Sequence, residues 1–195
     1  TRSFTIPNTT TTGKQFLLFV TDVFDNQDES DETDNVFAVP IEIKAPNLTI
    51  SGTPTAPNSA SLAETISLEY KVTNNGSVTA PANWSDRFYI SDDATLDDSD
   101  IRIGTRNTFS QTPLAAGDSY TTTANVFIPN TVGTGNKFLL FEVDRANQQA
   151  ETDETDNVKA IPIQIVAPNL TISGTPTTPS SASLGETISL KYTVT

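Results

Sequence analysis

Segments of this chain recur, with similar sequence, at a fixed spacing of 122 residues. Residues 45–73 align with 167–195 and residues 1–44 align with 123–166, without gaps, and roughly two-thirds of the overlapping positions are identical. Self-similarity at a fixed period is the signature of repeat architectures. The chain is therefore predicted to hold the C-terminal part of one repeat (1–44), a complete repeat (45–166) and the N-terminal part of the next (167–195).

Neither partial repeat is long enough to build a hydrophobic core by itself. Two explanations remain open at this point. The chain is a window on a longer tandem array, or its partial repeats are completed by neighbouring molecules in a fibre.

Period-2 alternation of apolar residues dominates the complete repeat, and no convincing helical periodicity is present. The predicted strands cover residues 48–51, 65–73, 83–91, 101–108, 119–128, 137–144 and 158–166, and turns are predicted for residues 52–61. Seven short strands separated by turns favour an all-β fold of tandem immunoglobulin-like seven-stranded β-sandwich repeats.

The strand around the single tryptophan carries several expectations about side chains. Trp84 and Phe88 are predicted to lie in the core, and Tyr89, between core positions, on the outer face of its sheet. Asp86 and Arg87 are adjacent and opposite in charge, so a local ion pair is expected.

The last strand of the repeat runs almost directly into the next repeat. Pro162 lies inside that strand and cannot donate a ladder hydrogen bond, so it requires a sheet edge or a bulge. Residues 158–166 are followed at once by Ala167, where the next repeat begins. Such short linkers predict limited bending between repeats and favour a rod, with neighbouring repeats or other copies of the protein as its partners.

Charge and composition exclude several function classes. The chain has 11 basic and 24 acidic residues, a net charge of −13, which opposes binding to nucleic acid and to anionic membranes. There is no cysteine and no histidine, so disulfides, thiolate catalysis and the commonest general base are absent. No apolar run is long enough to span a membrane, and no membrane insertion is expected in this segment. We predict no enzyme activity, no catalytic residue and no residue that binds an organic cofactor.

Six motifs follow one another along the complete repeat. In order they are PNLTISG, ISLEYKVTNNGS, WSDRFYISDDATLDDSD, LAAGDSY, FLLFEVDRANQQAETDETDNV and IPIQI. This series resembles the cell-adhesion-related domain found in bacteria, and the resemblance covers the complete repeat and both partial ones. It implies immunoglobulin-like domains that occur in tandem on large secreted or surface proteins, with an adhesive or structural role.

Two acidic segments carry the only recognisable chemistry, residues 91–100 and residues 147–157 with the preceding Asp144. Calcium takes six to eight oxygen ligands, which alternate acidic residues on a turning loop can supply. The candidate ligands in the complete repeat are Asp92, Asp93, Asp97, Asp98, Asp100, Asp144, Asn147, Glu151, Asp153 and Asp156. Their counterparts in the partial repeat that precedes it are Asp22, Asp25, Glu29, Asp31 and Asp34.

Solvated turns are the alternative to a calcium site in both segments. Aspartate and asparagine favour turns through local hydrogen bonds to the backbone, with no need for a metal. In an immunoglobulin-type sandwich, residues 91–100 are expected where the chain leaves one repeat and residues 147–157 where it enters the next. Two acidic loops meeting at each junction would repel one another, and a bridging cation would relieve that repulsion.

These observations predict a non-enzymatic structural repeat located outside the cell or on its surface. It would form a stiff rod, a fibre or a surface array, stabilised by Ca²⁺ at its acidic loops. The alternative is an adhesive or carbohydrate-binding module that recognises a ligand such as a surface glycan.

Overall fold

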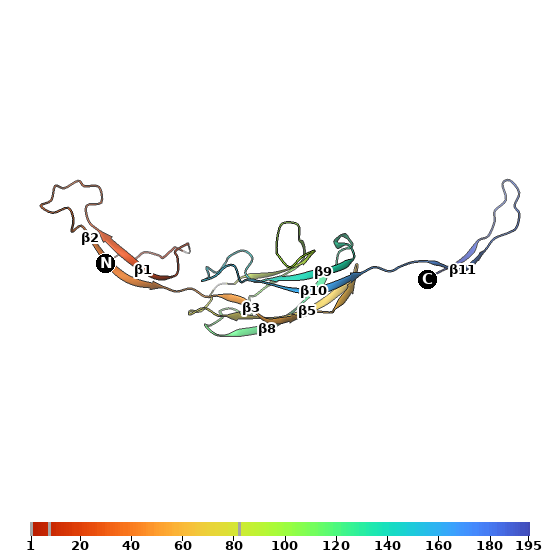
Figure 1. Cartoon of the computed structure of the whole chain (residues 1–195), viewed down its shortest axis with the longest axis horizontal. Coiled ribbons are helices and arrows are strands. Elements are labelled where there is room, and N and C mark those ends of the chain that lie inside the picture. The colour runs from red at the N-terminus through yellow and green to blue at the C-terminus, as the bar shows by residue number, and fades with distance from the viewer. Residues whose placement is uncertain (1, 8, 82) are drawn as a thin grey trace.

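The complete repeat forms a sandwich of two β-sheets in the computed structural model, which describes residues 2–7, 9–81 and 83–195 (Figure 1). One sheet has the order β3-β5-β8, and the other the order β4-β10-β9-β6-β7. The strands are β3 (Leu48–Thr55), β4 (Ser59–Ser61), β5 (Thr65–Asn74), β6 (Ser85–Ser91), β7 (Ile101–Asn107), β8 (Ser119–Phe127), β9 (Gly135–Glu142) and β10 (Val158–Val166). This all-β arrangement fits the predicted immunoglobulin-like sandwich.

The core lies between the two sheets and is built by strict alternation along the strands. On β5 every second residue is buried, from Ile66 to Val72, while the residues between them face solvent. The opposite sheet contributes Phe88 and Phe141, whose ring centroids lie 5.7 Å apart in an edge-on arrangement. Trp84 and Phe88 are each 1% exposed, so the prediction that they belong to the core is confirmed.

One strand was not expected from the sequence. Among the described residues the sandwich has eight strands, because Ser59–Ser61 forms the short strand β4 inside the segment predicted to be turns. This strand pairs in parallel with β10 only at Gln164–Val166. Pro162 lies opposite Phe138 of β9 and beyond the reach of β4, so it occupies an edge, as predicted.

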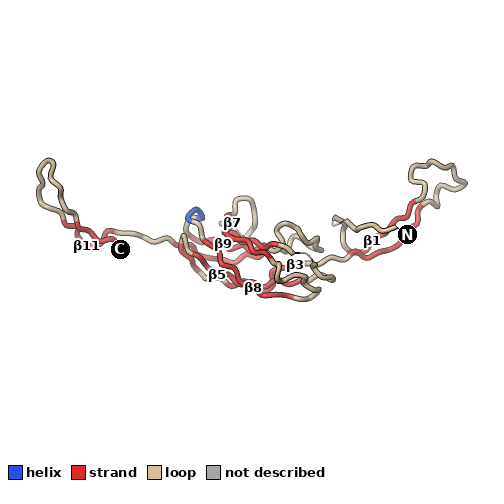
Figure 2. Tube along the Cα trace, turned by 180° about the vertical axis from the view of Figure 1, so that it is seen from behind, coloured by secondary structure: helices blue, strands red, loops and turns tan. Residues whose placement is uncertain are grey.

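A β-hairpin lies beyond each end of the sandwich (Figures 1 and 2). The first consists of β1 (Gly13–Val20) and β2 (Val36–Ile43), and the second of β11 (Ile172–Thr177) and β12 (Lys191–Val194). Gly13 pairs with Ile43 as Gly135 pairs with Ile165, so the first hairpin has the register of β9 and β10.

The second hairpin has the register of β3 and β5 in the same way. Ile172 pairs with Val194 as Ile50 pairs with Val72, and both hairpins have an irregularity after the next pair. Each hairpin therefore folds as the corresponding strands of the sandwich do, although its apolar side chains, such as Phe16 and Leu190, are exposed.

Regular helical structure in the described residues is confined to a short 3-10 turn, Asn130–Val132. In the part of the chain that the structure describes, no helix is long and apolar enough to cross a membrane.

Candidate structural junction and acidic loops

Residues 44–47 connect β2 to β3, and the side chain of Asn47 fastens this connection to the β9–β10 loop (residues 143–157). Asn47 Oδ1 accepts hydrogen bonds from the Asp153 N–H at 2.9 Å and from the Thr152 hydroxyl at 3.0 Å. Asn47 Nδ2 donates to Asp156 Oδ2 at 3.0 Å. Asn47 is 9% exposed, and every hydrogen bond of its side chain goes to this one loop. Only one N–H of its amide group is not used there.

The backbone on both sides of Asn47 makes further bonds to the same loop. The Thr152 N–H donates to the Pro46 carbonyl at 2.9 Å, and the Leu48 N–H donates to Glu151 Oε2. On the opposite side, the Asn75 N–H donates to the Asn47 carbonyl at 2.7 Å. We call this set of contacts around Pro46, Asn47 and Leu48 the junction clamp.

Glu151 is the most perturbed carboxylate of the clamp. Its side chain is 9% exposed, and Oε1 is buried without a hydrogen-bond partner. Burial raises the pKa of Glu151 to about 8; the Leu48 N–H lowers it, and the carboxylates of Glu154, Asp144 and Asp156 raise it. The ionised form of Glu151 is therefore costly where it lies.

Asp144 begins the loop and holds its first turn. Its carboxylate accepts hydrogen bonds from the N–H groups of Gln148 and Gln149 at 2.9 and 2.7 Å. The residue is buried and has a φ of 46°, a left-handed conformation that aspartate tolerates better than most residues. Burial raises the pKa of Asp144 to about 6, against the effect of these two N–H groups.

The remaining predicted ligands of this loop have different surroundings. Asn147 is exposed, with a φ of 46°, and donates its N–H to the Asp144 carbonyl at 2.9 Å. Asp153 is exposed and accepts hydrogen bonds from the N–H and hydroxyl of Thr155 at 2.8 and 2.6 Å, which lower its pKa. Both residues stabilise local turns.

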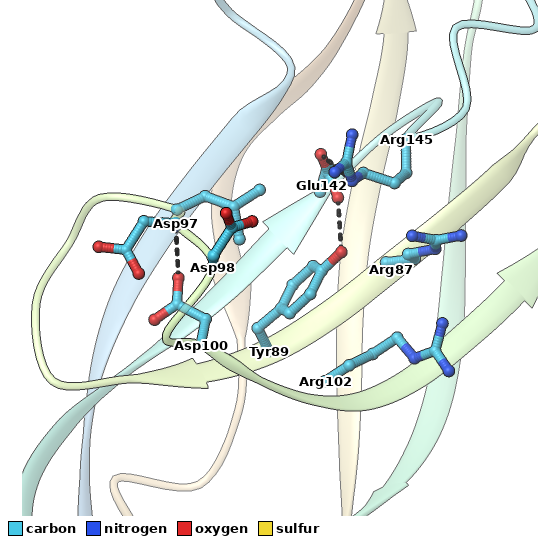
Figure 3. A pocket seen from close by; sticks show the side chains of 9 residues that line it. Arg87, Tyr89, Asp97, Asp98, Asp100, Arg102, Glu142 and Arg145 are labelled. Carbon is cyan, nitrogen blue, oxygen red and sulfur yellow. Dashed lines mark hydrogen bonds and ion pairs between the residues drawn. The ribbon is translucent and has the colours of Figure 1, made fainter.

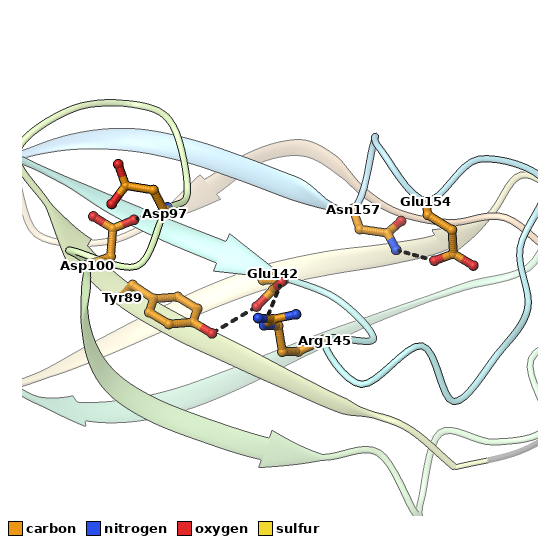
Figure 4. A network of polar contacts seen from close by, with 7 residues as sticks. All are labelled: Tyr89, Asp97, Asp100, Glu142, Arg145, Glu154 and Asn157. Carbon is orange, nitrogen blue, oxygen red and sulfur yellow. Dashed lines mark hydrogen bonds and ion pairs between the residues drawn. The ribbon is translucent and has the colours of Figure 1, made fainter.

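One buried oxygen of the loop, besides Glu151 Oε1, also lacks a donor. Asn157 is 6% exposed, its Oδ1 has no hydrogen-bond partner, and its amide donates to Glu154 Oε2 at 3.5 Å (Figure 4). Within the described residues, however, no group of three or more His, Cys, Asp or Glu side chains is arranged to hold a metal ion.

The upstream copy of the loop reproduces its internal bonds. Asp22 accepts hydrogen bonds from the N–H groups of Asn26 and Gln27 at 3.0 and 2.8 Å, and Asp31 accepts both bonds from Thr33. The other predicted ligands there, Asp25, Glu29 and Asp34, are exposed. The loop therefore holds its shape through local bonds, and in the complete repeat the clamp adds contacts between the loop and residues 46–48 at the start of that same repeat.

The other acidic loop, between β6 and β7, is also held by local bonds. Asp93 caps the Thr95 N–H at 2.7 Å, Asp97 caps the Ser99 N–H at 2.7 Å, and Asp100 accepts from the Asp97 N–H at 2.8 Å. Asp92 forms an ion pair with Lys137, and Asp98 is exposed.

The position of the β6–β7 loop differs from the expectation. Asp97, Asp98 and Asp100 line a cavity with Tyr89 on the outer face of the five-stranded sheet, so the loop tip stands over that face (Figures 1 and 3). We expected the loop at the end of the sandwich where the chain leaves. The structure does not direct these three carboxylates towards a following repeat.

The expected ion pair between Asp86 and Arg87 is wrong. Neighbouring residues of a strand point to opposite faces, so Arg87 faces outward while Asp86, 1% exposed, faces the core. Tyr70 donates its hydroxyl to Asp86 Oδ2 at 2.7 Å, and Oδ1 is buried without a partner. The alternation of the strand predicts that position 86 faces the core. The sequence does not show that the buried carboxylate is hydrogen-bonded by Tyr70.

Tyr89 does face outward, as predicted, yet it is only 8% exposed. Its hydroxyl donates to Glu142 Oε2 at 3.0 Å, and Glu142 in turn lies 3.4 Å from the Arg145 guanidinium (Figure 4). Burial raises the pKa of Glu142, against the effects of Tyr89 and Arg145.

Comparison with solved structures gives matches of low identity. The chain is similar to the crystal structure of the CARDB domain of the PF1109 protein from Pyrococcus furiosus in complex with di-metal ions, at 20% identity and a TM-score of 0.47, covering 66% of this chain and 100% of that one. The same domain in solution gives 19% identity and a TM-score of 0.46, covering 64% and 98%. A β-glucosidase from Listeria innocua in complex with glucose gives 14% and 0.38, covering 73% of this chain and only 20% of the enzyme.

No curated protein matches the chain. The sequence model of the CARDB family, in contrast, matches residues 45–161, which is most of the complete repeat and more than half of the chain. The chain belongs to the CARDB family.

Proposed function

We propose that this chain is part of a non-enzymatic structural array outside the cell or on a bacterial surface, built from tandem 122-residue repeats that act as a stiff spacer. Membership of the CARDB family supports an extracellular, non-enzymatic role. The observation that carries the proposal is the junction clamp, which leaves almost no free linker between consecutive units.

The clamp restricts bending because it fixes the chain where it enters the sandwich. Only residues 44–47 separate β2 from β3, and residues 45–48 are all buried. A flexible linker requires backbone that is free of tertiary contacts. Here the Pro46 carbonyl, both ends of the Asn47 amide and the Leu48 N–H are all engaged.

A second contact region supports the same role. Ile6, Pro7 and Thr10 of the upstream repeat line one cavity of about 400 Å³ together with Gln148 and Glu151 of the β9–β10 loop. The upstream repeat thus approaches the loop on which the clamp is built. A bend at residues 44–47 would have to change both sets of contacts.

We further propose that Ca²⁺ stabilises the β9–β10 loop. Glu151 Oε1 and Asn157 Oδ1 are buried oxygens without donors, and buried polar atoms normally have a partner. The carboxylates of Asp144, Glu154 and Asp156 lie close enough to Glu151 to raise its pKa. A cation bound among these oxygens would offset the repulsion, and calcium prefers carboxylate and amide oxygen ligands. Solvated turns remain the alternative for Asp153 and for the β6–β7 loop.

Thermal unfolding of the whole chain tests the calcium proposal, with CaCl₂, MgCl₂ or EDTA present. A ligand at 100 times its Kd adds about 2.7 kcal/mol to the free energy of unfolding, a rise of several degrees in Tm. We expect a calcium-specific rise that is lost in Glu151→Gln and kept in Glu69→Gln, a matched change at an exposed position of β5. A Tm that does not respond to calcium would contradict the calcium proposal and leave the loop held by its own hydrogen bonds.

A further inference from the structure

A charged cavity lies on the outer face of the five-stranded sheet, away from the junction clamp (Figure 3). It has a volume of about 570 Å³ and is covered on one side by the β6–β7 loop. Tyr89 separates two groups of side chains in the close-up view: Arg87, Arg102 and Arg145 lie on one side, and the aspartates of the loop on the other. Ligand sites in proteins commonly have volumes of 300–1,000 Å³.

The gathering of arginines is unusual for this chain. Three of its five arginines line this cavity, although the net charge is −13. Arg87 Nε is buried without an acceptor, and in the described part of the chain neither Arg87 nor Arg102 has an ion-pair partner. Arg145 already pairs with Glu142, which lines the same cavity, so Arg87 and Arg102 are the guanidinium groups with unused donors for an anionic group, most favourably a planar carboxylate.

Two residues of the cavity have counterparts in the upstream copy of the repeat, and both differ in chemistry. Glu142 and Arg145 correspond to Val20 and Val23 in the upstream copy. The acidic residues of the following loop are retained in both copies, as in the pair Glu151 and Glu29. A structural role has to recur in each repeat, whereas a ligand site needs to occur only once.

We propose that this cavity binds a carboxylated saccharide, a uronic acid unit of an extracellular glycan. Arg87 and Arg102 receive the sugar carboxylate, and the carboxylates of Asp98 and Asp100 accept hydrogen bonds from ring hydroxyls on the opposite side of Tyr89. One further observation favours a saccharide over an acidic peptide. The aspartates accept hydrogen bonds from the hydroxyl donors that a sugar ring carries in number, and a glutamate side chain of a peptide offers no such donor.

Binding of tri-galacturonate to the whole chain tests this proposal, measured by calorimetry in EDTA so that calcium cannot bridge sugar and protein. Neutral galactotriose and a Glu-Glu-Glu peptide are the comparison ligands. We expect saturable binding of tri-galacturonate that weakens as salt is added, and at least tenfold weaker binding of the two other ligands.

The informative variant is Arg102→Gln, since Arg102 is exposed on β7 and has no ion-pair partner among the described residues. The matched control is Arg106→Gln on the same strand, whose guanidinium donates to the Thr123 carbonyl on the other sheet at 2.9 Å. We expect Arg102→Gln to weaken binding at least tenfold with an unchanged Tm, and Arg106→Gln to leave the affinity unchanged. No binding of tri-galacturonate, equal binding of galactotriose, preferred binding of the peptide, or equal losses in both variants would overturn the proposal. Because these measurements do not involve the clamp or calcium, their failure leaves the proposed structural role intact.

Discussion

Asn47 Nδ2 donates a hydrogen bond to Asp156 Oδ2 across 3.0 Å, between two residues 109 positions apart in the sequence. The bond joins the first residue before β3 to the last acidic residue before β10. Since Asn47 Oδ1 accepts two more bonds from the same loop, this one side chain connects the start of the repeat to its end.

Replacement of Asn47 by alanine should therefore destabilise the sandwich. Three side-chain hydrogen bonds are lost, each worth about 1 kcal/mol, so we expect the free energy of unfolding to fall by about 3 kcal/mol. Urea unfolding followed by tryptophan fluorescence measures this, because Trp84 is the only tryptophan and lies in the core.

Asn169→Ala is the matched control for Asn47→Ala. Asn169 occupies the equivalent position in the partial repeat and is exposed. Its replacement should leave the unfolding of the central sandwich unchanged within about 0.5 kcal/mol. Equal losses in the two variants would show that the effect at position 47 does not come from the clamp.

Ala63→Gly should stabilise the sandwich. Ala63 has a φ of 62°, a left-handed conformation that costs a residue with a Cβ about 1–2 kcal/mol, and the equivalent residue Gly185 has a φ of 82°. Removal of the Cβ should raise the free energy of unfolding by about 1 kcal/mol. The greater conformational entropy of glycine in the unfolded chain reduces this gain. The opposite result is expected for Ala160→Gly in β10, and a loss of stability in both variants would contradict the account.

Gly76→Ala should displace the backbone of Pro46 and Asn47, and so disturb the clamp from the side opposite the β9–β10 loop. A Cβ on Gly76 would lie 2.4 Å from the carbonyl carbon of Pro46, which is backbone and cannot rotate away. We expect a loss of about 1–3 kcal/mol, typical of overpacking, in urea unfolding. Ser77→Ala, at the adjacent exposed position, should be neutral; a neutral Gly76→Ala would mean that residues 44–47 move freely.

Stability should fall as the pH rises from about 4 to about 7, in part because of Asp86. Burial raises the pKa of Asp86 from 3.8 to about 7, even though Tyr70 donates a hydrogen bond to the carboxylate. The folded state thus binds more protons than the unfolded chain in this window, and the stabilisation present below pH 4 is lost as the pH passes 7. The shift corresponds to at most about 4 kcal/mol.

Asp86→Asn should reduce this pH dependence, because the amide oxygen still accepts from Tyr70 and no charge forms. Asp144 and Glu151 have raised pKa values as well and act in the same direction, so some dependence should remain. Urea midpoints between pH 4.5 and 8 measure the effect, with exposed Asp118→Asn as control. An unchanged pH slope in Asp86→Asn would contradict the buried location of the carboxyl.

Sequence alone predicted the strands well, because half-buried strands show their period directly. The strand predicted at residues 158–166 is β10 with the same bounds, and the one at 65–73 is β5 less one residue. It missed β4, since three residues that pair in parallel with a distant strand leave no local pattern. Gly52 and Pro54 favoured a turn, so the second half of β3, which continues to Thr55 after an irregularity, was also missed.

The sites were predicted less completely than the fold. Acidic turns are visible in the sequence, but the different roles of Asp153 and Glu151 are not. Asp153 caps its own turn, whereas Glu151 is buried against β3 and accepts from the Leu48 N–H, 103 positions away. The arginines of the outer face come from two strands, β6 and β7, and from the β9–β10 loop, so no sequence window brings them together. Both the burial of Glu151 and the grouping of the arginines depend on contacts between residues that are far apart in the sequence.

The distance between two spin labels one repeat apart tests the proposed stiff spacer most directly. Because the chain has no cysteine, Ser67→Cys and Ser189→Cys in a protein with two complete repeats give unique exposed attachment sites at equivalent positions. A stiff spacer should give a single narrow distance distribution by pulsed electron resonance that broadens in Asn169→Ala, which lies at the junction between the labelled repeats. A broad distribution that the substitution does not alter would contradict it.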